Sequence, residues 1–245
     1  MPAPRFRCTN LLAPGLAGRT VDLDPAAAHH ATRVLRLAIG DALTLFDGTG
    51  GEYAATLIRA DKRGASVRVE RFLPVERESH LALTLAQGIV ASDAMDSAIR
   101  KATELGVTAI QPLVTARSAP MGDGERGAKR VAHWRQVATA AAEQSGRNRI
   151  PEVAAPCSLA DWLSSWRGTG IVFLPEAEMA IAALAPPAMP LAVMIGPEGG
   201  FDARESAAAK AQGFHALRLG PRVLRADTAA AAALAVLQSA WGDWR

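Results

Sequence analysis

The segment with the clearest chemical character is Ile195-Gly196-Pro197-Glu198-Gly199-Gly200-Phe201, which follows an apolar run. Its glycines allow the backbone to approach a ligand closely, and its proline stiffens the turn. The segment has neither a lysine nor the glycine spacing of a phosphate-binding loop, and the carboxylate of Glu198 would repel a phosphate. It therefore favours a neutral or partly cationic ligand over a nucleotide polyphosphate.

Two other turns follow predicted strands and also carry charge. One is Leu174-Pro175-Glu176, and the other runs from Leu219 to Thr228. If the three strands are parallel neighbours, the three turns lie at one edge of a sheet and surround a single ligand. Glycine and proline end strands in many proteins, so one such turn alone is more often structural; three in succession favour a site. These two turns supply Leu174, Pro175, Leu219, Gly220, Val223, Leu224, Arg225 and Thr228 as candidate ligand-binding residues.

A second polar cluster follows the long helix predicted over residues 127–145. A solvated helix end, with a cation facing the negative end of the helix dipole, accounts for one arginine. The set is denser than a helix end requires, which leaves a binding or catalytic role open. Its members are Glu143, Gln144, Arg147, Asn148 and Arg149.

The elements that must position these turns are typical of an α/β domain. Strands alternate with helices after residue 76, which predicts a mostly parallel sheet with helices on both faces. Asp202-Ala203-Arg204-Glu205 has the spacing of a capping box and predicts a helix start. We expect strands over 80–87, 107–114, 170–174, 190–195 and 214–219, and helices over 92–105, 127–145, 158–166, 202–212 and 225–241.

The first third of the chain has a different pattern. Glycine-rich turns separate short strands over 42–46, 52–58 and 67–70, which is typical of a small β-barrel. One short helix over 26–35 interrupts them, with Asp24 as its expected N-cap and Pro25 in its first turn. A polar break over 74–79 predicts two domains, residues 1–75 and 76–245.

Charge is distributed unevenly between these two parts. Residues 1–75 hold ten Lys or Arg and seven Asp or Glu, whereas the rest of the chain holds seventeen of each. An arginine-rich surface is explained by base composition of the genome or by contact with RNA, because guanidinium groups pair with phosphates and stack on bases. The helix that carries His29, His30, Arg33 and Arg36 is correspondingly either a solvated basic face or an RNA contact.

Other features exclude several classes of protein. The two cysteines, Cys8 and Cys157, are far apart and form no metal-binding spacing, and no His-x-x-x-His or Ser-His-Asp arrangement is evident. The apolar stretch from Ala226 to Trp241 is interrupted by polar residues, and the first residues lack the apolar core of a signal peptide. We therefore expect a cytoplasmic protein that binds neither a membrane nor a metal.

Several motifs together resemble one enzyme family. They are Lys101-Ala102-Thr103-Glu104-Leu105-Gly106-Val107, Glu143-Gln144-Ser145 with Arg147, the segment from Ile195 to Phe201, and Leu219-Gly220 through Leu224-Arg225-Ala226-Asp227-Thr228-Ala229. Their order and spacing are similar to those of the RsmE family, the 16S ribosomal RNA (uracil-N3)-methyltransferases of the SPOUT superfamily. Residues 5–7 and 30–36 resemble the N-terminal motif of that family. The combination is specific, whereas any single motif is not.

The resemblance implies a PUA-like β-barrel over residues 1–75 and a SPOUT α/β domain with a trefoil knot over residues 76–245. It also implies a homodimer that binds S-adenosylmethionine through the three turns and methylates N3 of a uridine in 16S rRNA, as part of the small ribosomal subunit. Arg147 or Arg225 is then the candidate to support the uracil base. The residues expected to bind RNA are Arg5, Arg7, His30, Arg33, Arg36, Arg147 and Arg149.

Two departures from the family pattern keep other functions open. The family has a lysine in the stretch that corresponds to residues 89–94, where this chain has none, and a glutamate where this chain has Asp227. The alternatives are a SPOUT methyltransferase that acts on another rRNA base or on a ribose, and an RNA-binding ribosome assembly factor without catalytic activity.

Overall fold

The computed structural model describes residues 3–9 and 17–244. The chain forms two compact units, of which unit 1 comprises Met1–Glu78 with Ala142–Ile150 and unit 2 comprises Ser79–Ala141 with Pro151–Arg245. The segment Ala142–Ile150, which the sequence pattern placed with the second domain, packs within unit 1.

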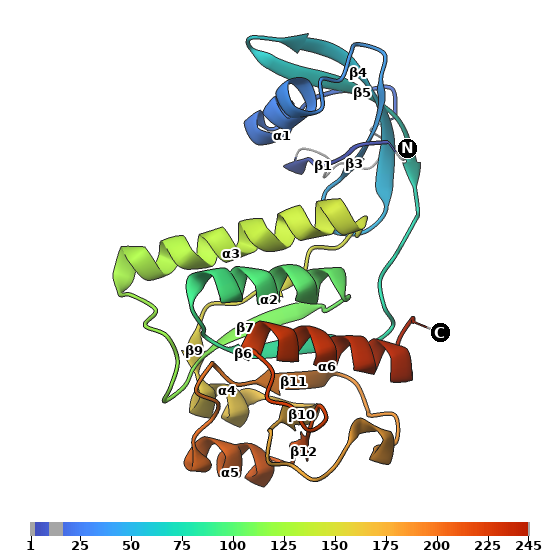
Figure 1. Ribbon diagram of the computed structural model, residues 1–245. Helices are drawn as coiled ribbons and strands as arrows, with labels where there is room; N and C mark the ends of the chain where they lie inside the picture. The colour runs from blue at the N-terminus through green and yellow to red at the C-terminus, as the bar shows by residue number, and fades with distance from the viewer. Residues whose placement is uncertain (1–2, 10–16, 245) are drawn as a thin grey trace. The chain divides into compact units, whose positions relative to one another are not determined.

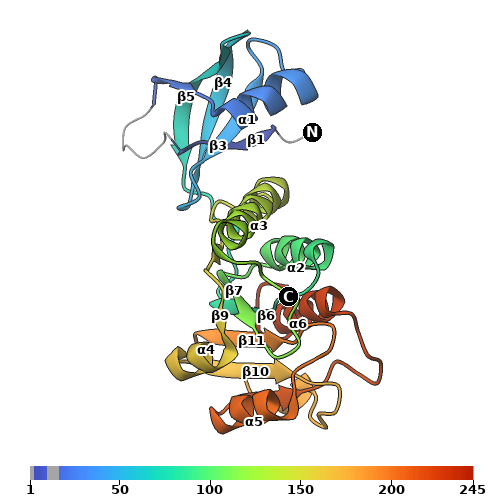
Figure 2. The same cartoon turned by 90° about the vertical axis from the view of Figure 1, so that its left-hand side faces the viewer.

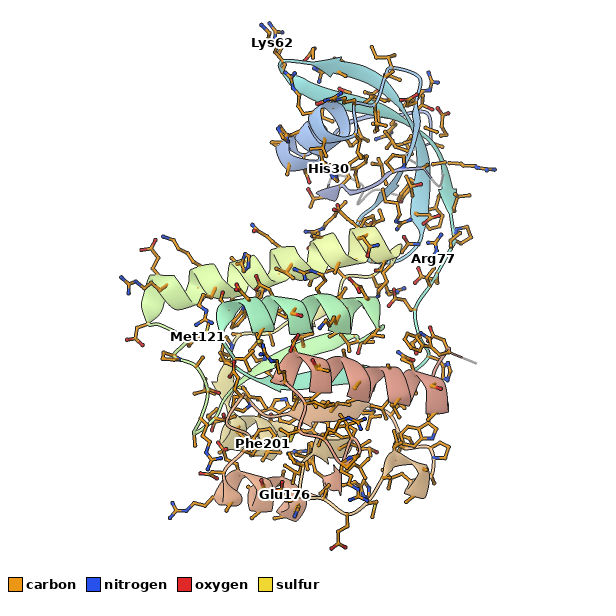
Figure 3. All side chains as sticks on the ribbon, in the orientation of Figure 1. His30, Lys62, Arg77, Met121, Glu176 and Phe201 are labelled. Carbon is orange, nitrogen blue, oxygen red and sulfur yellow. The ribbon has the colours of Figure 1, made fainter. Side chains whose placement is uncertain are left out.

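Unit 1 is built on a five-stranded sheet in the order β1-β3-β4-β5-β2 (Figures 1 and 2). The two expected hairpins are present, because β3 pairs with β4 and β4 pairs with β5, both antiparallel. Lys62 lies at the tip of the second hairpin (Figure 3). The strands are β1 (Arg5–Arg7), β2 (Thr20–Asp22), β3 (Ala42–Phe46), β4 (Glu52–Asp61) and β5 (Gly64–Leu73).

The short helix of unit 1 differs in detail from the expectation. It consists of α1 (Pro25–His29), with a proline in its first turn, and a π-helical turn η2 (His30–Val34). Asp24 is the N-cap residue but its side chain makes no capping bond; its carboxylate instead accepts a hydrogen bond from Thr9. The capping role expected for the Asp24 side chain is therefore wrong, because the hydroxyl of Thr9, remote in sequence, engages the carboxylate first.

Alternation along the strands accounts for the core of unit 1. Leu43 and Leu45 of β3 and Val67 and Val69 of β5 are buried, and Arg68 between the two valines is exposed. In a strand successive side chains point to opposite faces, so these residues line one face of the sheet. The remaining core members are Phe6, Cys8, Val21, Leu23, Ala28, Ala31, Ala55, Leu57 and Ala65.

Unit 2 contains a parallel sheet in the order β12-β10-β11-β6-β7-β8, with β9 also paired to β7. All of these pairings are parallel, as the alternation of strands and helices predicts. The strands are β6 (Leu83–Gly88), β7 (Ala109–Val114), β8 (Glu152–Val153), β9 (Cys157–Ser158), β10 (Thr169–Phe173), β11 (Leu191–Ile195) and β12 (His215–Leu217).

Helices cover both faces of this sheet (Figures 1 and 2). One face packs on α4 and α5: Trp162 and Leu163 of α4 and Ala209 of α5 belong to the same apolar cluster as the sheet residues Ala192 and Met194. The other face carries α2 and α6. The helices are α2 (Ser92–Glu104), α3 (Gly124–Ser145), α4 (Leu159–Ser165), α5 (Ala203–Ala211) and α6 (Ala226–Trp241), with a 3-10 turn η3 (Ile181–Ala183).

The expected capping box at the start of α5 is confirmed. The Asp202 carboxylate accepts a hydrogen bond from the Glu205 amide at 2.7 Å, and the Glu205 carboxylate accepts one from the Asp202 amide at 2.9 Å. Two of the unpaired amides at the helix start are thereby satisfied. This local device fixes where the chain leaves the turn over residues 196–202 and enters the helix.

A network of ion pairs and hydrogen bonds lies within unit 1 around Glu52. Its carboxylate accepts hydrogen bonds from Arg5 and Arg77, and Arg5 also donates to Asn148. The amide of Asn148 in turn donates to the backbone carbonyl of Val75 at 2.6 Å. Because Asn148 is fully buried, each of these bonds replaces one that water would otherwise supply.

We predict that Glu52 makes the stability of unit 1 sensitive to acid. Burial raises the pKa of its carboxyl group, but the hydrogen bonds from Arg77 and Arg5 outweigh burial and lower the pKa from 4.5 to about 2. The folded state therefore binds fewer protons than the unfolded state between these values. The stabilisation is complete above pH 4.5 and is lost as the pH falls toward 2.

Replacing Glu52→Gln should lower the free energy of unfolding at pH 7 by up to about 3 kcal/mol, since one pKa unit corresponds to about 1.4 kcal/mol. Differential scanning calorimetry of both proteins should show that this difference in the free energy of unfolding becomes smaller as the pH falls to about 3. Glu125→Gln serves as the control, because Glu125 pairs only at the surface with Lys129. A difference in stability between the wild type and Glu52→Gln that does not change with pH would rule out the ionised Glu52 as its cause.

Candidate functional site

A cavity of about 510 Å³ lies at the carboxyl edge of the sheet in unit 2. Strand β10 pairs in parallel with β11 on one side and with β12 on the other. The turns that follow these three strands therefore meet at one edge, which confirms the arrangement expected from the sequence. In open α/β sheets this edge is where ligands bind.

The cavity gathers most of the residues that the sequence pointed to. Thr228 does not line it; this residue is exposed in the first turn of α6, where Ala226 and Ala229 face the cavity instead. The predicted residues that line the cavity are Leu174, Pro175, Ile195, Gly196, Pro197, Glu198, Gly199, Gly200, Leu219, Gly220, Val223, Leu224 and Arg225.

Sequence reasoning missed a few lining residues. Phe173 directly precedes one predicted turn, and Phe201 and Arg222 lie inside the other two, so the neighbouring residues were sufficient to find them. Arg117 had no local signal, because it lies about eighty residues before the segment that it contacts. Its position just after β7 could have identified it, since β7 ends at the same edge of the sheet.

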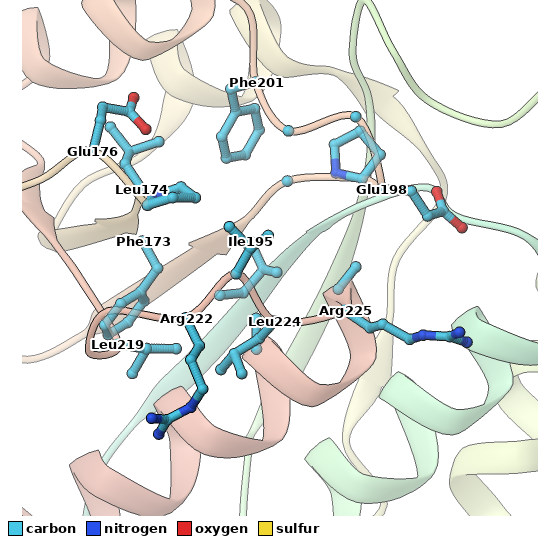
Figure 4. A pocket seen from close by; sticks show the side chains of 18 of the residues that line it. Phe173, Leu174, Glu176, Ile195, Glu198, Phe201, Leu219, Arg222, Leu224 and Arg225 are labelled. Atoms are coloured by element: carbon cyan, nitrogen blue, oxygen red, sulfur yellow. The ribbon is translucent and has the colours of Figure 1, made fainter.

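The centre of the cavity is apolar and its rim is charged. Figure 4 shows Leu174, Ile195 and Leu224 around the central space, whereas the guanidinium groups of Arg222 and Arg225 extend away from it. A flat apolar group can therefore occupy the interior while polar groups of a ligand reach the rim or the glycine-rich backbone.

Glu198 has a defined partner in the fold. Its Oε1 accepts a hydrogen bond from the amide of Ala91 at 3.0 Å, and Ala91 is the N-cap residue of α2. The carboxylate thus satisfies an amide that a helix start leaves without an internal partner. This contact favours a role for Glu198 in ordering the turn over a role as a proton acceptor.

The turn containing Glu198 packs very closely on the end of β6. A β-carbon added at Gly88 would lie 2.6 Å from Cδ of Pro197, closer than real β-carbons approach other atoms. Gly88 is therefore required for this contact. The side-chain amide of the neighbouring Gln87 donates a hydrogen bond to the Gly88 carbonyl at 3.0 Å and a longer one to the carbonyl of Gly196 at 3.4 Å.

The outer side of the same turn is held by the loop that follows β7. Arg117 donates a hydrogen bond to the Gly199 carbonyl at 2.6 Å. The amide of Ala116 donates to Glu205, the same carboxylate that completes the capping box of α5. The glycine-rich turn is therefore constrained from both sides, although its sequence alone is flexible.

Asp227 anchors the third turn to helix α2. Its Oδ2 accepts hydrogen bonds from Lys101 at 2.9 Å and from Ser97 at 2.8 Å. Partial burial raises the pKa of the Asp227 carboxyl group, but these two bonds outweigh burial and lower the pKa, so the group is ionised at neutral pH. Asp227, where the chain departs from the family pattern, is thus hydrogen-bonded to two side chains of α2.

Several predicted RNA-binding residues are engaged within unit 1. Arg147 is only 4% exposed and forms an ion pair with Glu78 through Nη2, with a second bond through Nε at 3.1 Å. Arg5 bonds to Glu52 and Asn148 and lies over the ring of Phe46. Both arginines thus hold unit 1 together, and Arg147 does not line the cavity of unit 2.

The polar cluster around residue 147 is neither a solvated helix end nor a free binding surface. Glu143 accepts a hydrogen bond from the backbone amide of Arg7 at 2.7 Å, and burial raises the pKa of the Glu143 carboxyl group. Arg149 is half-exposed and pairs with Glu76 at 3.2 Å. The density of polar groups that the sequence showed here is explained by packing within unit 1.

Three other predicted RNA-binding residues lie on an exposed face, whereas Arg7 is partly buried. His30, Arg33 and Arg36 are all exposed, and His30 lies beside the ring of Phe6 (Figure 3). Arg36 has a φ of 56°, a left-handed conformation that is uncommon for residues other than glycine. Such backbone conformations recur at functional sites. These three residues form the basic face of unit 1.

The described part of the chain lacks two further features. None of its helices combines the length and apolar character needed to cross a membrane. In residues 3–9 and 17–244, no group of three or more His, Cys, Asp or Glu side chains is placed to hold a metal ion.

Comparison with protein families finds two matches along the chain. Residues 77–238 match the model of an RNA methyltransferase domain. Residues 23–70 match the model of an RNA methyltransferase PUA domain. The chain thus combines a PUA-like N-terminal part with an RNA methyltransferase domain in a mixed α/β fold.

Individual relatives agree with the family match. Ribosomal RNA small subunit methyltransferase E of Mycobacterium bovis is 35% identical over 91% of this chain and 89% of the relative. The crystal structure of the Neisseria gonorrhoeae enzyme of that name, bound to S-adenosylmethionine, is 35% identical with a TM-score of 0.92 and full coverage of both chains. A methyltransferase structure from Legionella pneumophila with bound cofactor is 37% identical, with a TM-score of 0.93 over 99% of this chain and all of that one. The chain belongs to the family of ribosomal RNA small subunit methyltransferase E.

Proposed function

We propose that the protein transfers a methyl group from S-adenosylmethionine to N3 of a uridine in the 16S rRNA of the small ribosomal subunit. One observation carries the proposal: three turns predicted to share a ligand line the same cavity, in a chain similar to two solved methyltransferases that are bound to S-adenosylmethionine. The uracil and its N3 atom follow from the family resemblance of the motifs.

The residues of the cavity fit this cofactor. A volume of about 510 Å³ is within the range of small-molecule sites. The apolar centre between Leu174, Ile195 and Leu224 suits an adenine ring, and the turns lack the features that bind phosphate. Glu176 and Glu198 on the rim are compatible with a ligand that carries positive charge but no phosphate. When bound, S-adenosylmethionine supplies an electrophilic methyl group on a positively charged sulfur.

The chain's own part in the reaction is to hold the uracil and stabilise its charge. N3 of uracil is weakly acidic, and its loss of a proton places negative charge on the two ring oxygens. We assign the stabilisation of that charge to Arg225, because it lines the cavity at the start of α6. Its guanidinium group extends away from the centre in Figure 4, so the side chain must turn toward the base when the base binds. The proton goes to water or to a carboxylate; Glu198 is already engaged with Ala91.

The target base must leave its helix to reach the cavity, because base pairing buries N3. We propose that the basic face of unit 1, formed by His30, Arg33 and Arg36, binds the surrounding rRNA backbone. The exposure of these three side chains and the positive charge of the two arginines support this proposal. A contact of this kind makes binding weaker as salt concentration rises. Because the substrate is a ribosomal subunit, we place the protein in the cytoplasm.

The finer features of the fold are part of the same proposal. For unit 1 we propose a β-barrel, supported by the shifts of register between β4 and β5, which bend strands. For unit 2 we propose a trefoil knot, supported by the family and by the convergence of three turns on one cavity. We also propose a homodimer, supported by the exposed apolar residues Val236 and Trp244 near the C-terminus.

We predict that the purified protein methylates small-subunit particles at a single uridine. Particles from cells lacking the activity should accept one labelled methyl group, and mass spectrometry of the nucleosides should identify 3-methyluridine. Another methylated base or a 2′-O-methylated ribose would identify the alternative enzyme. If isothermal titration detects no binding of S-adenosylmethionine, the protein is an RNA-binding assembly factor and the proposal is wrong.

We predict different consequences of replacing the two candidate arginines. Arg225→Ala should lower kcat by about 10²–10³ with little change in melting temperature, as expected for loss of one charge-stabilising donor. Arg147→Ala should destabilise unit 1 by roughly 3 kcal/mol, because it removes a buried arginine and leaves the partly buried Glu78 carboxylate without its partner.

Single-turnover rates and calorimetry on the same samples distinguish these effects. Arg222→Ala is the matched control for Arg225→Ala, since it removes another arginine that lines the cavity and that also extends away from its centre (Figure 4), but that lies outside α6. If Arg147→Ala keeps its stability but loses turnover, Arg147 rather than Arg225 supports the base.

A further inference from the structure

Helix α2 contacts two of the three cavity turns through polar groups. At its start, the amide of Ala91 donates to Glu198 in the turn after β11. Farther along, Lys101 and Ser97 bond to Asp227 just after the turn that follows β12. These turns lie more than twenty residues apart in the chain, yet both are bonded to one rigid element.

Asp227 lies directly beside residues that line the cavity, so its position affects theirs. It lies in the first turn of α6, two residues after Arg225, which is the N-cap of that helix. A carboxylate at this position is favoured by the helix dipole and by the Lys101 ammonium group. The Asp227 side chain is only 17% exposed, so its bonds are less screened than those of a surface pair.

Apolar packing alone does not fix the start of α6 along α2. The two helices pack against each other. Their buried residues include Ile99 and Ala102 of α2 and Leu234 and Leu237 of α6. Alanine and leucine contacts are non-directional and tolerate small shifts along the helix axis. The bonds of Asp227 are directional, so they set where the first turn of α6 stands.

We propose that Asp227, held by Lys101 and Ser97, is a positioning residue that fixes Arg225 and Leu224 at the cavity. In the same way Glu198 fixes the turn after β11 to the start of α2. Helix α2 therefore holds two of the cavity turns in a fixed position relative to each other, an arrangement that we call the frame. This inference rests on the proposed function only where it concerns cofactor and turnover; the frame itself exists without a ligand.

The obvious alternative is an ordinary surface ion pair with little effect. The pair between Lys129 and Glu125 provides that comparison, because both side chains are largely exposed and belong to one helix. Lys101 and Asp227 differ from it in joining two helices, in sharing Ser97 and in being partly buried. Lys129→Met is therefore the matched control for Lys101→Met.

The test compares Asp227→Asn, Lys101→Met and their double variant with the wild-type protein. We expect each single variant to raise the Kd for S-adenosylmethionine and lower kcat by about tenfold, with the double variant no worse than either single one. Lys129→Met should bind and turn over as the wild type does. Asp227→Glu should restore most of the activity, because it keeps the charge that Lys101 requires.

A second double-mutant cycle, with Asp227 and Arg225, tests whether Asp227 acts through Arg225. In a protein that already carries Arg225→Ala, adding Asp227→Asn should lower kcat by less than about twofold, whereas in the wild type the loss should be about tenfold. Equal losses in the two backgrounds would show that Asp227 does not work by positioning Arg225.

Hydrogen exchange of the ligand-free proteins separates this inference from the proposed function. Amides in residues 219–226 should exchange faster in Asp227→Asn than in the wild type, and Lys129→Met should leave them unchanged. Unchanged exchange together with wild-type binding and turnover in Asp227→Asn would overturn the inference and leave the proposed function intact. Faster exchange in a protein that never binds S-adenosylmethionine would support the frame and refute the proposed function.

Discussion

The parallel pairing of β10 with both β11 and β12 is the constraint on which the site depends. It aligns Phe173 with Leu217, and Val172 with Met194, so that the three strands end at nearly the same level. Hydrogen bonds along the strands fix this alignment, and buried apolar side chains hold it on both faces of the sheet. Without it the three turns would be ordinary surface loops with no shared interior.

The turns themselves are shaped by contacts from outside the three strands. Gly88 allows Pro197 to approach the end of β6, and Arg117 bonds to Gly199 from the loop after β7. Helix α2 adds polar bonds to two of the turns. A cavity built from flexible glycine-rich segments is in this way held ready before any ligand arrives, which reduces the entropy lost on binding.

Local signals in the sequence were sufficient for most of the second unit. The capping box at Asp202 and Glu205 and the fully buried strand β11 depend on residues close together in the chain, so their patterns predict them directly. The three cavity turns could also be found, because the rule for parallel sheets converts sequence order into a place at one edge.

Signals that depend on distant partners could not be found in the same way. The role of Arg147 follows from Glu78, and that of Asp24 from Thr9, and nothing near either residue in the sequence indicates its partner. A cluster of charged side chains looks the same in sequence whether it binds RNA or packs within a unit. Burial decides between the two, and burial is a property of the fold.

The most direct test of the central claim is a crystal structure of the protein soaked with S-adenosylmethionine. The account predicts density for one cofactor molecule enclosed by the turns that follow β10, β11 and β12, with its adenine among Leu174, Ile195 and Leu224. Cofactor density at another place on the chain, or contact with only one of the three turns, would contradict it.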